Sequence, residues 1–185
     1  MLVLASASPR RQELLSSAGI QFEVQPADIR EAQLPGEAAK ACAERLAREK
    51  ALAVASQRPD DCVLGADTVV VVDGQLLGKP IDAADAARML RLLSGRQHEV
   101  ITGVCLIVSG QASVASETTL VRMSGISEKE IADYVAGGEP MDKAGAYAIQ
   151  GIASRWIPGI EGDYSNVVGL PIALVFRMLR DYGCV

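Results

Sequence analysis

The chain has 185 residues and a formal net charge of −5 at pH 7, with 49% hydrophobic and 22% charged residues. This size and composition are typical of one globular domain that buries a sizeable core. An acidic chain is a poor general binder of nucleic acid polymers, so an anionic ligand would have to be held by a local cluster of cations.

The first half of the chain predicts strands and helices in alternation, each read from hydrophobic periodicity and from turn residues. Gly19 is a suitable stop for the first helix, because a left-handed residue commonly follows a helix end. In chain order the expected elements are a strand over residues 2–5, a helix over 9–18, a strand over 20–24, a polar loop over 28–36 and a long helix over 37–56.

The junction between the first strand and the first helix carries a strong local signal. Ser8 suits the helix cap and Pro9 suits the first turn. A helix N-terminus offers free N–H groups and a partial positive charge, and Arg10 and Arg11 add fork-shaped donors that match phosphate oxygens. The sequence therefore predicts a phosphate site within the first dozen residues.

Lys50 lies on the apolar stripe of the long helix over residues 37–56. One interpretation is a lysine that extends outward along its own aliphatic stem. The other is an ammonium group that points into a site.

The second half of the chain predicts further strands and helices that complete one α/β domain over residues 1–185, with a mixed sheet flanked by helices. Asp73–Gly74 is a typical hairpin turn, and Ser127 with Glu130 forms a capping box. The expected elements are strands over 62–66, 69–72, 75–78, 100–108, 112–123 and 146–149, helices over 83–93, 127–136 and 171–182, and a loop over 159–169.

Several polar residues are candidates for chemistry, each with a plainer alternative. Asp67 follows an apolar strand, at the end where α/β sheets place ligands, but a turn aspartate that caps the next segment fits equally. Lys79, Glu31 and Gln150 are either site residues or solvated side chains. His98 is the only histidine and is interpreted as structural.

The motifs that are absent narrow the possible chemistry. With a single histidine, a two-histidine metal site is excluded, so any metal would be a hard, oxygen-ligated ion such as Mg²⁺ or Mn²⁺. No P-loop and no Rossmann fingerprint is present, and no nucleophile elbow.

The cysteines and apolar runs give expectations about location. Cys42, Cys62, Cys105 and Cys184 lack metal-ligand spacing and are too few for a disulfide scaffold. Cys62 and Cys105 lie in apolar runs, so both are expected to be core thiols. No run reaches membrane-spanning length and no signal peptide is recognised, which favours a reduced, cytoplasmic protein without a membrane partner.

A series of short segments follows in order along nearly the whole chain: residues 5–11 (ASASPRR), Glu31, Lys50, 65–68 (GADT), 78–80 (GKP), 102–104 (TGV), 142–151 (DKAGAYAIQG) and 162–171 (GDYSNVVGLP). Together they resemble the Maf family of nucleoside triphosphate pyrophosphatases. The segment 146–151 resembles the branch that is specific for dTTP and UTP.

The resemblance implies hydrolysis of the α–β bond of a nucleoside triphosphate, which releases a monophosphate and pyrophosphate with help from a divalent cation. It also implies a fold with a deep cleft, similar to inosine triphosphate pyrophosphatases, and a homodimer. The proposed cellular role is the removal of noncanonical nucleotides, modified pyrimidine nucleotides included, and the family name reflects a link to septum formation.

The same resemblance supplies residue roles. Asp67 is the assigned proton acceptor, and Arg10, Thr68 and Gln150 are associated with base choice. Catalysis is expected from Asp67, Lys50 and Lys79, substrate binding from Ser8, Arg10, Arg11, Thr68 and Gln150, and metal binding from Glu31 and Asp67.

The residue types fit this assignment, because phosphate chemistry is mostly positioning and stabilisation of charge. Whether Asp67 takes a proton, binds the metal or does both stays open. Two other functions are also open at this point: a nucleotide-binding regulator without turnover, and a phosphomonoesterase that releases inorganic phosphate.

Overall fold

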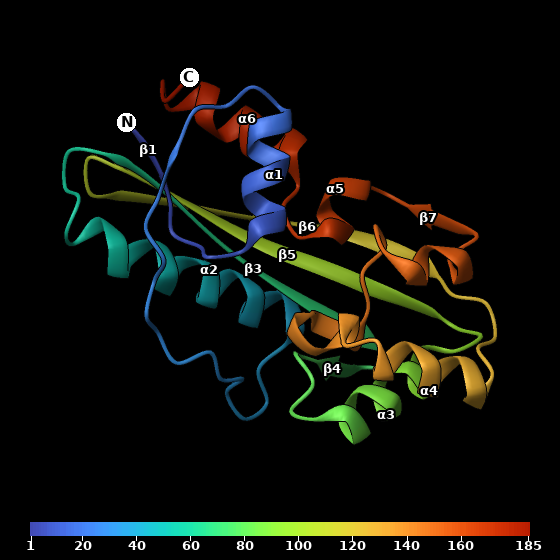
Figure 1. Ribbon diagram of the computed structural model, residues 1–185. Helices are drawn as coiled ribbons and strands as arrows, with labels where there is room; N and C mark the ends of the chain where they lie inside the picture. The colour runs from blue at the N-terminus through green and yellow to red at the C-terminus, as the bar shows by residue number, and fades with distance from the viewer. The chain divides into compact units, whose positions relative to one another are not determined.

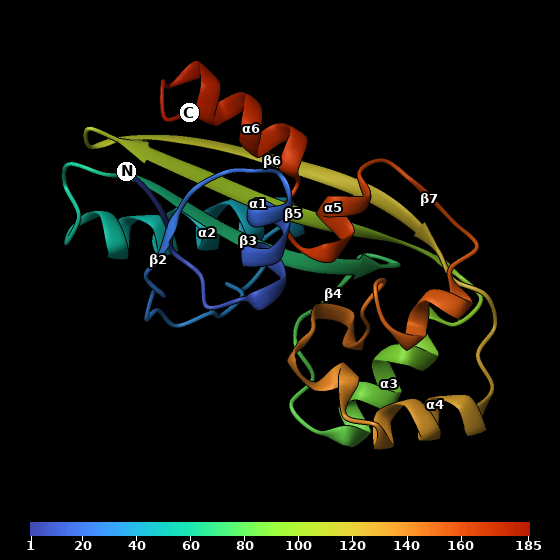
Figure 2. The same ribbon diagram turned by 45° about the horizontal axis from the view of Figure 1, so that its top comes forward.

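Figures 1 and 2 show a computed structural model, which describes residues 1–185. Its contacts divide the chain into two compact units. Unit 1 comprises Met1–Thr68, Thr102–Glu117 and Gly169–Val185, and unit 2 comprises Val69–Ile101 and Thr118–Val168. A seven-stranded mixed sheet has the strand order β2-β1-β3-β5-β6-β7, with β4 paired to β3. The predicted α/β class with a mixed sheet and flanking helices is confirmed.

Unit 1 contains the parallel part of the sheet, in which β1 pairs with both β2 and β3. Three long strands, β3, β5 and β6, contribute residues to both units. The elements that contribute to unit 1 are β1 (Leu2–Leu4), α1 (Pro9–Ser17), β2 (Glu23–Val24), α2 (Ala39–Ala55), β3 (Cys62–Val72), β5 (Gln97–Val108), β6 (Gln111–Arg122) and α6 (Ile172–Asp181).

Helices cover both faces of the sheet in unit 1, with α2 on one face and α1 and α6 on the other (Figures 1 and 2). Successive side chains of a strand point to opposite faces, so each strand contributes to two cores. Leu4 and Leu64 pack with Leu15 of α1 and with residues of α6. Val3 and Val63 pack instead against the alanines of α2. Asp67 and Thr68, further along β3, inherit this alternation.

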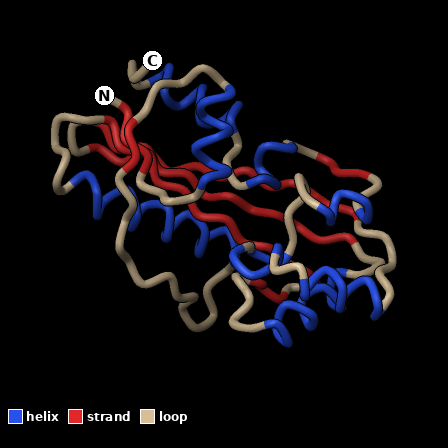
Figure 3. Tube along the Cα trace, viewed as in Figure 1, coloured by secondary structure: helices blue, strands red, loops and turns tan.

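Unit 2 is built mainly from short helices and 3₁₀ turns (Figure 3). Several predicted turn signals are confirmed: Asp73 and Gly74 both have positive φ, Asp82 caps α3, and Ser127 forms its capping box at α4. The elements of unit 2, apart from the shared strands, are β4 (Gln75–Leu77), α3 (Ala83–Leu93), α4 (Glu128–Ala136), η1 (Glu139–Asp142), η2 (Ala144–Ala146), η3 (Ile152–Trp156), β7 (Gly159–Glu161) and α5 (Tyr164–Val168).

Three predicted elements differ in the structure. The strand expected to stop at Ala66 continues as β3 to Val72, because Asp67 and Thr68 each find polar partners on their own face and do not break the strand. The short strand over 146–149 is absent. Gly145 and Ala146 both have positive φ, and two such residues in succession turn the chain out of an extended course.

The loop predicted over residues 159–169 is partly ordered. Residues 159–161 form β7, which pairs antiparallel with β6. The carboxylate of Asp163 accepts hydrogen bonds from the backbone N–H groups of Ser165 and Asn166, and this cap starts α5. No helix in the structure combines the length and the apolar character needed to cross a membrane.

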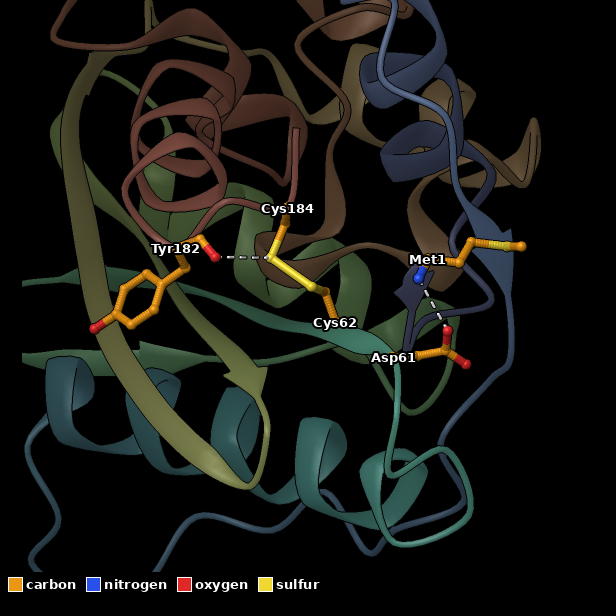
Figure 4. The surroundings of a disulfide bond; sticks show 5 residues. All are labelled: Met1, Asp61, Cys62, Tyr182 and Cys184. Carbon is orange, nitrogen blue, oxygen red and sulfur yellow. Dashed lines mark hydrogen bonds and ion pairs between the residues drawn. A yellow bond between two sulfur atoms is a disulfide. The ribbon is translucent and has the colours of Figure 1, made fainter.

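The expectation of a free thiol at Cys62 is wrong. Cys62, at the start of β3, forms a disulfide with Cys184, which follows α6, and their Cα atoms lie 6.5 Å apart (Figure 4). In the same region Asp61 accepts a hydrogen bond from the N-terminal ammonium group of Met1 at 3.0 Å (Figure 4). The two cysteines are 122 residues apart, so their spacing alone gave no sign of the pairing. Cys105 is a buried free thiol, as predicted.

Candidate active site

Helix α2 lies unusually close to strands β3 and β5. A Cβ atom added at Gly65 would lie 2.3 Å from the carbonyl oxygen of Ala47, and one added at Gly103 would lie 2.4 Å from that of Ala43. Any larger residue at either glycine would push the helix outward. The close approach brings Lys50, one turn beyond Ala47, within reach of the sheet.

The ammonium group of Lys50 bridges two carboxylates. Its Nζ lies 2.7 Å from Oδ1 of Asp67 and 2.9 Å from Oε1 of Glu31. Lys50 and Asp67 are both buried, whereas the side chain of Glu31 is 40% exposed. Lys50 is therefore not an outward-extending surface lysine. A buried charge needs partners of opposite sign, and this cluster supplies two of them with one net negative charge.

A second ionic group holds the loop that carries Glu31. Arg45 of α2 donates to both carboxylate oxygens of Glu37, at 2.6 and 2.8 Å, and to the carbonyl oxygen of Ala32 at 2.8 Å. The hydrogen bonds from Arg45 lower the pKa of Glu37 to about 2. Because Ala32 directly follows Glu31, this clamp fixes the chain next to one of the two carboxylates on Lys50.

The start of α1 has the predicted cap. The side chain of Ser8 accepts a hydrogen bond from the backbone N–H of Arg11, and the Oγ of Ser6 accepts one from the N–H of Ser8 at 3.3 Å. Arg10 is half-buried, whereas Arg11 is buried. The guanidinium of Arg11 donates to the hydroxyl of Thr68, which makes these two residues neighbours in unit 1.

Two predicted site residues belong to unit 2. Lys79 is exposed and lies in a bend after β4. Gln150 is exposed in a turn, not at the end of the strand that was expected there. Their contacts with a ligand stay predictions.

His98, also in unit 2, is a core residue. Its Nε2 lies 2.7 Å from the hydroxyl of Tyr147, and burial lowers the pKa of the imidazole to about 4. The structural interpretation of His98 agrees with this environment.

Comparison with protein families gives one result for almost the whole length. A family described as Maf-like protein matches residues 1–182. The chain belongs to the Maf family. The match runs through both units and includes every residue of the Lys50 cluster.

Curated relatives of this Maf chain share one description. A protein of Koribacter versatilis (strain Ellin345) is 60% identical over 98% of this chain and 94% of its own length. Relatives from Geobacter sp. (strain M21) and Symbiobacterium thermophilum are 53% and 52% identical, over 100% and 98% of this chain and 96% and 94% of their own lengths. All three are named dTTP/UTP pyrophosphatase.

Among solved structures, the Staphylococcus aureus Ham1 protein aligns with a TM-score of 0.42 and 13% identity, over 66% of this chain and 71% of its own. A likeness this low carries no weight for the fold or the function.

The sequence led to roles for the charged residues of this Maf site and for some neutral ones, but not for all of its neutral members. Ser6, Thr102 and Gly169 lie in the segments that carry the family resemblance but were given no role, although each contacts Arg11 or Thr68 in unit 1. The sequence did contain one signal for Thr102: a hydroxyl residue in an otherwise apolar strand segment is expected to be buried. The structure buries it fully. A buried hydroxyl requires a hydrogen-bond partner, so its presence pointed to a polar neighbour.

Proposed function

We propose that this chain hydrolyses nucleoside triphosphates, dTTP and UTP among them, to the monophosphate and pyrophosphate. The observation that carries the proposal is the buried contact between Lys50 and Asp67, with Glu31 on the same ammonium group. Such a cluster of opposite charges is costly to bury and has no need to exist in a plain structural core. The shared description of relatives at 50–60% identity supports the same activity.

In this proposal Asp67 accepts the proton of the attacking water. Lys50 contacts Oδ1 of Asp67, so the second carboxylate oxygen, Oδ2, is the one assigned to the water. The ammonium orients the carboxylate and offsets negative charge that builds on the phosphate oxygens during attack at the α-phosphorus. The proton moves from water to Asp67 as the bond to pyrophosphate breaks.

The donor set fits a divalent cation such as Mg²⁺ or Mn²⁺. Glu31 and Asp67 supply two carboxylates beside one ammonium, and the structure has no group of three ligating side chains that would form an all-protein cage. Magnesium is commonly held by one or two carboxylates together with substrate phosphates. When bound, the cation would neutralise phosphate charge and lower the pKa of a coordinated water.

The remaining roles rest on the helix N-terminus for Ser8 and Arg10, and on the family resemblance for Lys79 and Gln150. We propose that Ser8 and Arg10 contact phosphate, that Lys79 contributes a further cation, and that Gln150 takes part in choosing a pyrimidine base. A site that hydrogen-bonds its proper base rejects others, because the wrong base leaves buried polar groups unpaired.

We also propose a homodimer in the cytoplasm with a role in clearing noncanonical nucleotides. Light scattering on the purified chain tests the dimer directly, and twice the 19.5 kDa mass of one chain is the expected result.

The decisive experiment is a screen of purified protein against nucleoside triphosphates with Mg²⁺ or Mn²⁺ and identification of both products. The proposal expects monophosphate and pyrophosphate from UTP and dTTP. Release of inorganic phosphate alone would favour a phosphomonoesterase, and binding without product would favour a regulator.

An Asp67→Asn variant provides the background for that screen. We expect it to fold normally and to lose turnover by at least about 100-fold, since general-base catalysis contributes on this order. Activity near the wild-type level in this variant would remove Asp67 from the mechanism.

A further inference from the structure

Arg11 uses its guanidinium group almost entirely inside unit 1. Four of its five N–H groups donate to protein oxygens: Nε to Gly169 O at 2.8 Å, Nη1 to Ala66 O at 2.9 Å and to Ser6 Oγ at 3.2 Å, and Nη2 to Thr68 Oγ1 at 3.1 Å. Phosphate recognition by arginine normally uses a pair of parallel N–H groups. In Arg11 both nitrogens of the fork already serve other acceptors.

All four acceptors of Arg11 are uncharged oxygens. The nearest carboxylates act only at a distance: Asp67 and Glu31 raise the pKa of Arg11 through their charge, while burial, the larger effect, lowers it. Ala66 and Thr68 share one face of β3, and Asp67 between them points to the other face, where Lys50 lies. Arg11 and Lys50 therefore act on β3 from opposite sides.

The hydroxyl group of Thr68 has three polar partners within this network. It accepts from Arg11, lies 2.9 Å from the hydroxyl of Thr102 and lies 3.3 Å from the carbonyl oxygen of Gly169. A hydroxyl has one donor and two lone pairs. Either hydroxyl of the Thr68–Thr102 pair can be the donor; when Thr102 donates to Thr68 and Thr68 donates to the carbonyl oxygen of Gly169, all three positions are filled. Direct contact between this hydroxyl and a nucleotide base would break the network.

The network fixes Asp67 on both sides along the chain. Arg11 holds the carbonyl group of Ala66, which precedes Asp67, and the hydroxyl of Thr68, which follows it. Thr68, Thr102 and Gly169 are also three of the four residues of unit 1 at which the chain passes to or from unit 2. One guanidinium thus orders the backbone around the proposed base and ties it to two other segments.

We propose that Arg11 is a positioning residue for Asp67, acting through Thr68, Thr102 and the carbonyl group of Gly169, and that it is not a ligand of the triphosphate. The proposal rests on the proposed function for its catalytic part. It changes the role that the sequence predicted for Arg11 and gives a role to Thr102. The effect of Thr68 on base choice is then indirect.

Kinetics of four variants separate positioning from phosphate binding. Arg11→Lys keeps the positive charge but loses the fork, and Thr102→Val keeps the shape but loses the hydroxyl. We expect both to lower kcat for UTP by about 10- to 100-fold, the order of loss when a catalytic group is misplaced. We expect KM to stay within about twofold, because the affected interaction orients the base and not the substrate. Thr102→Ser restores the hydroxyl and should recover most of kcat.

Arg58→Lys is the matched control, because Arg58 is a partly exposed arginine of unit 1 that pairs with Glu23 and Asp61. We expect its kinetics to equal those of the wild type. A wild-type kcat in Arg11→Lys with a KM raised more than tenfold would overturn the proposal, because that pattern marks a phosphate ligand. Equal loss of kcat in Thr102→Val and Thr102→Ser would also overturn it.

Amide hydrogen exchange tests the network without any turnover. Exchange in residues 64–68 and 169–170 should become faster in both Arg11→Lys and Thr102→Val, and both segments should respond together. Unchanged exchange in either segment would overturn the network. If the wild type releases no pyrophosphate from any triphosphate, the proposed function fails, while the exchange data still decide whether Arg11 orders this part of β3.

Discussion

Two arginines of unit 1 order the proposed catalytic carboxylates in different ways. Arg11 is buried and donates only to uncharged oxygens, and burial lowers its pKa. Arg45 is partly exposed and donates to the carboxylates of Glu37 and Glu49, and these hydrogen bonds raise its pKa. The first holds the strand that carries Asp67, and the second holds the loop next to Glu31.

Because their acceptors differ in charge, the Arg11 and Arg45 networks should respond differently to salt and pH. A network of neutral acceptors does not titrate in the ordinary pH range and is shielded from salt by burial. An ion pair at the surface weakens with salt and with protonation of its carboxylate. The strand that carries Asp67 is thus anchored by contacts that do not depend on salt or pH. The loop that carries Glu31 is anchored by contacts that weaken with salt and with acid.

The largest effect is expected from Gly65→Ala, which displaces α2, the helix that carries Arg45 and Lys50. The new Cβ would lie 2.3 Å from Ala47 O and 2.9 Å from Ala51 Cβ, so the helix that carries Lys50 and Arg45 must move away from β3. We expect the free energy of unfolding to fall by about 3 kcal/mol or more, at the upper end of the range for overpacking. Denaturant unfolding measures this loss.

Gly125→Ala is the matched control, because nothing lies within 4 Å of a Cβ atom added there. Activity in Gly65→Ala should fall more than stability alone explains, since Lys50 leaves Asp67. Equal stabilities of the two glycine variants would contradict the close packing of α2.

The second prediction concerns His98, whose titration makes the stability of the whole chain depend on pH and must be known before the acid responses of the two arginine networks are compared. Burial lowers its pKa to about 4, and its Nδ1 has no hydrogen-bond partner. Between pH 6.5 and 4, His98 is protonated in the unfolded chain but stays neutral in the folded chain. The free energy of unfolding therefore falls as the pH falls through this window. The free energy of unfolding falls by about 3 kcal/mol, because the pKa drops from 6.5 to about 4 and each unit corresponds to about 1.36 kcal/mol.

Unfolding curves of the wild type and of His98→Phe at pH 7, 5.5 and 4 check this. The pH slope between 6.5 and 4 should largely disappear in the variant. A slope that persists would mean that other groups titrate there, and the imidazole would not be the cause.

The sequence allowed most of unit 1 to be predicted because its signals are local. The cap at Ser8, the stop at Gly19 and the stripe of α2 depend on neighbours within a turn or two. To predict that Lys50 and Asp67 belong to one site, helix and strand periodicity and the family resemblance were sufficient. These parts of the fold and site were therefore accessible without coordinates.

What escaped prediction depends on contacts between distant segments. Arg11 was assigned to phosphate because a guanidinium near a helix N-terminus offers donors, and nothing local revealed that Gly169 and Ala66 would take them. The strand was predicted to end before Asp67, and this was wrong for the same reason: Lys50, on another element, pairs with the Asp67 carboxylate within the strand. The disulfide between Cys62 and Cys184 joins residues 122 positions apart.

That disulfide gives the third prediction, on the Arg11 side of the sheet. It fixes the far end of α6, whose near end follows the Gly169 carbonyl that Arg11 holds. Cys184→Ser should lower the free energy of unfolding by about 2 kcal/mol or more, because the bond between residues 122 positions apart restricts the unfolded chain.

Reductant supplies the internal control for Cys184→Ser. A thiol reductant should remove the difference between the variant and the wild type, while activity stays the same in both. A variant as stable as the oxidised wild type would show that the bond does not form in solution.

The smallest effect is expected from Glu37→Gln, on the Arg45 side. The substitution keeps the shape of the side chain but removes the charge that Arg45 holds, so the loop beside Glu31 is less firmly fixed. If Glu31 binds a metal, the concentration of Mg²⁺ needed for half-maximal activity should rise by less than about tenfold, because partly exposed ion pairs contribute little. Activity at saturating Mg²⁺ should be unchanged.

Glu49→Gln removes the other carboxylate on Arg45 and leaves the contact with Ala32 in place, so its Mg²⁺ requirement should match the wild type. Acid gives an independent readout. The folded pKa of Glu37 is lowered to about 2, so its stabilisation is present above pH 4.5 and disappears as the pH falls toward 2. The stabilities of Glu37→Gln and the wild type should therefore converge over that interval. The stability loss in Arg11→Lys should not change there, since no acceptor of Arg11 takes up a proton; a parallel acid response in both variants would remove the distinction between the two arginines.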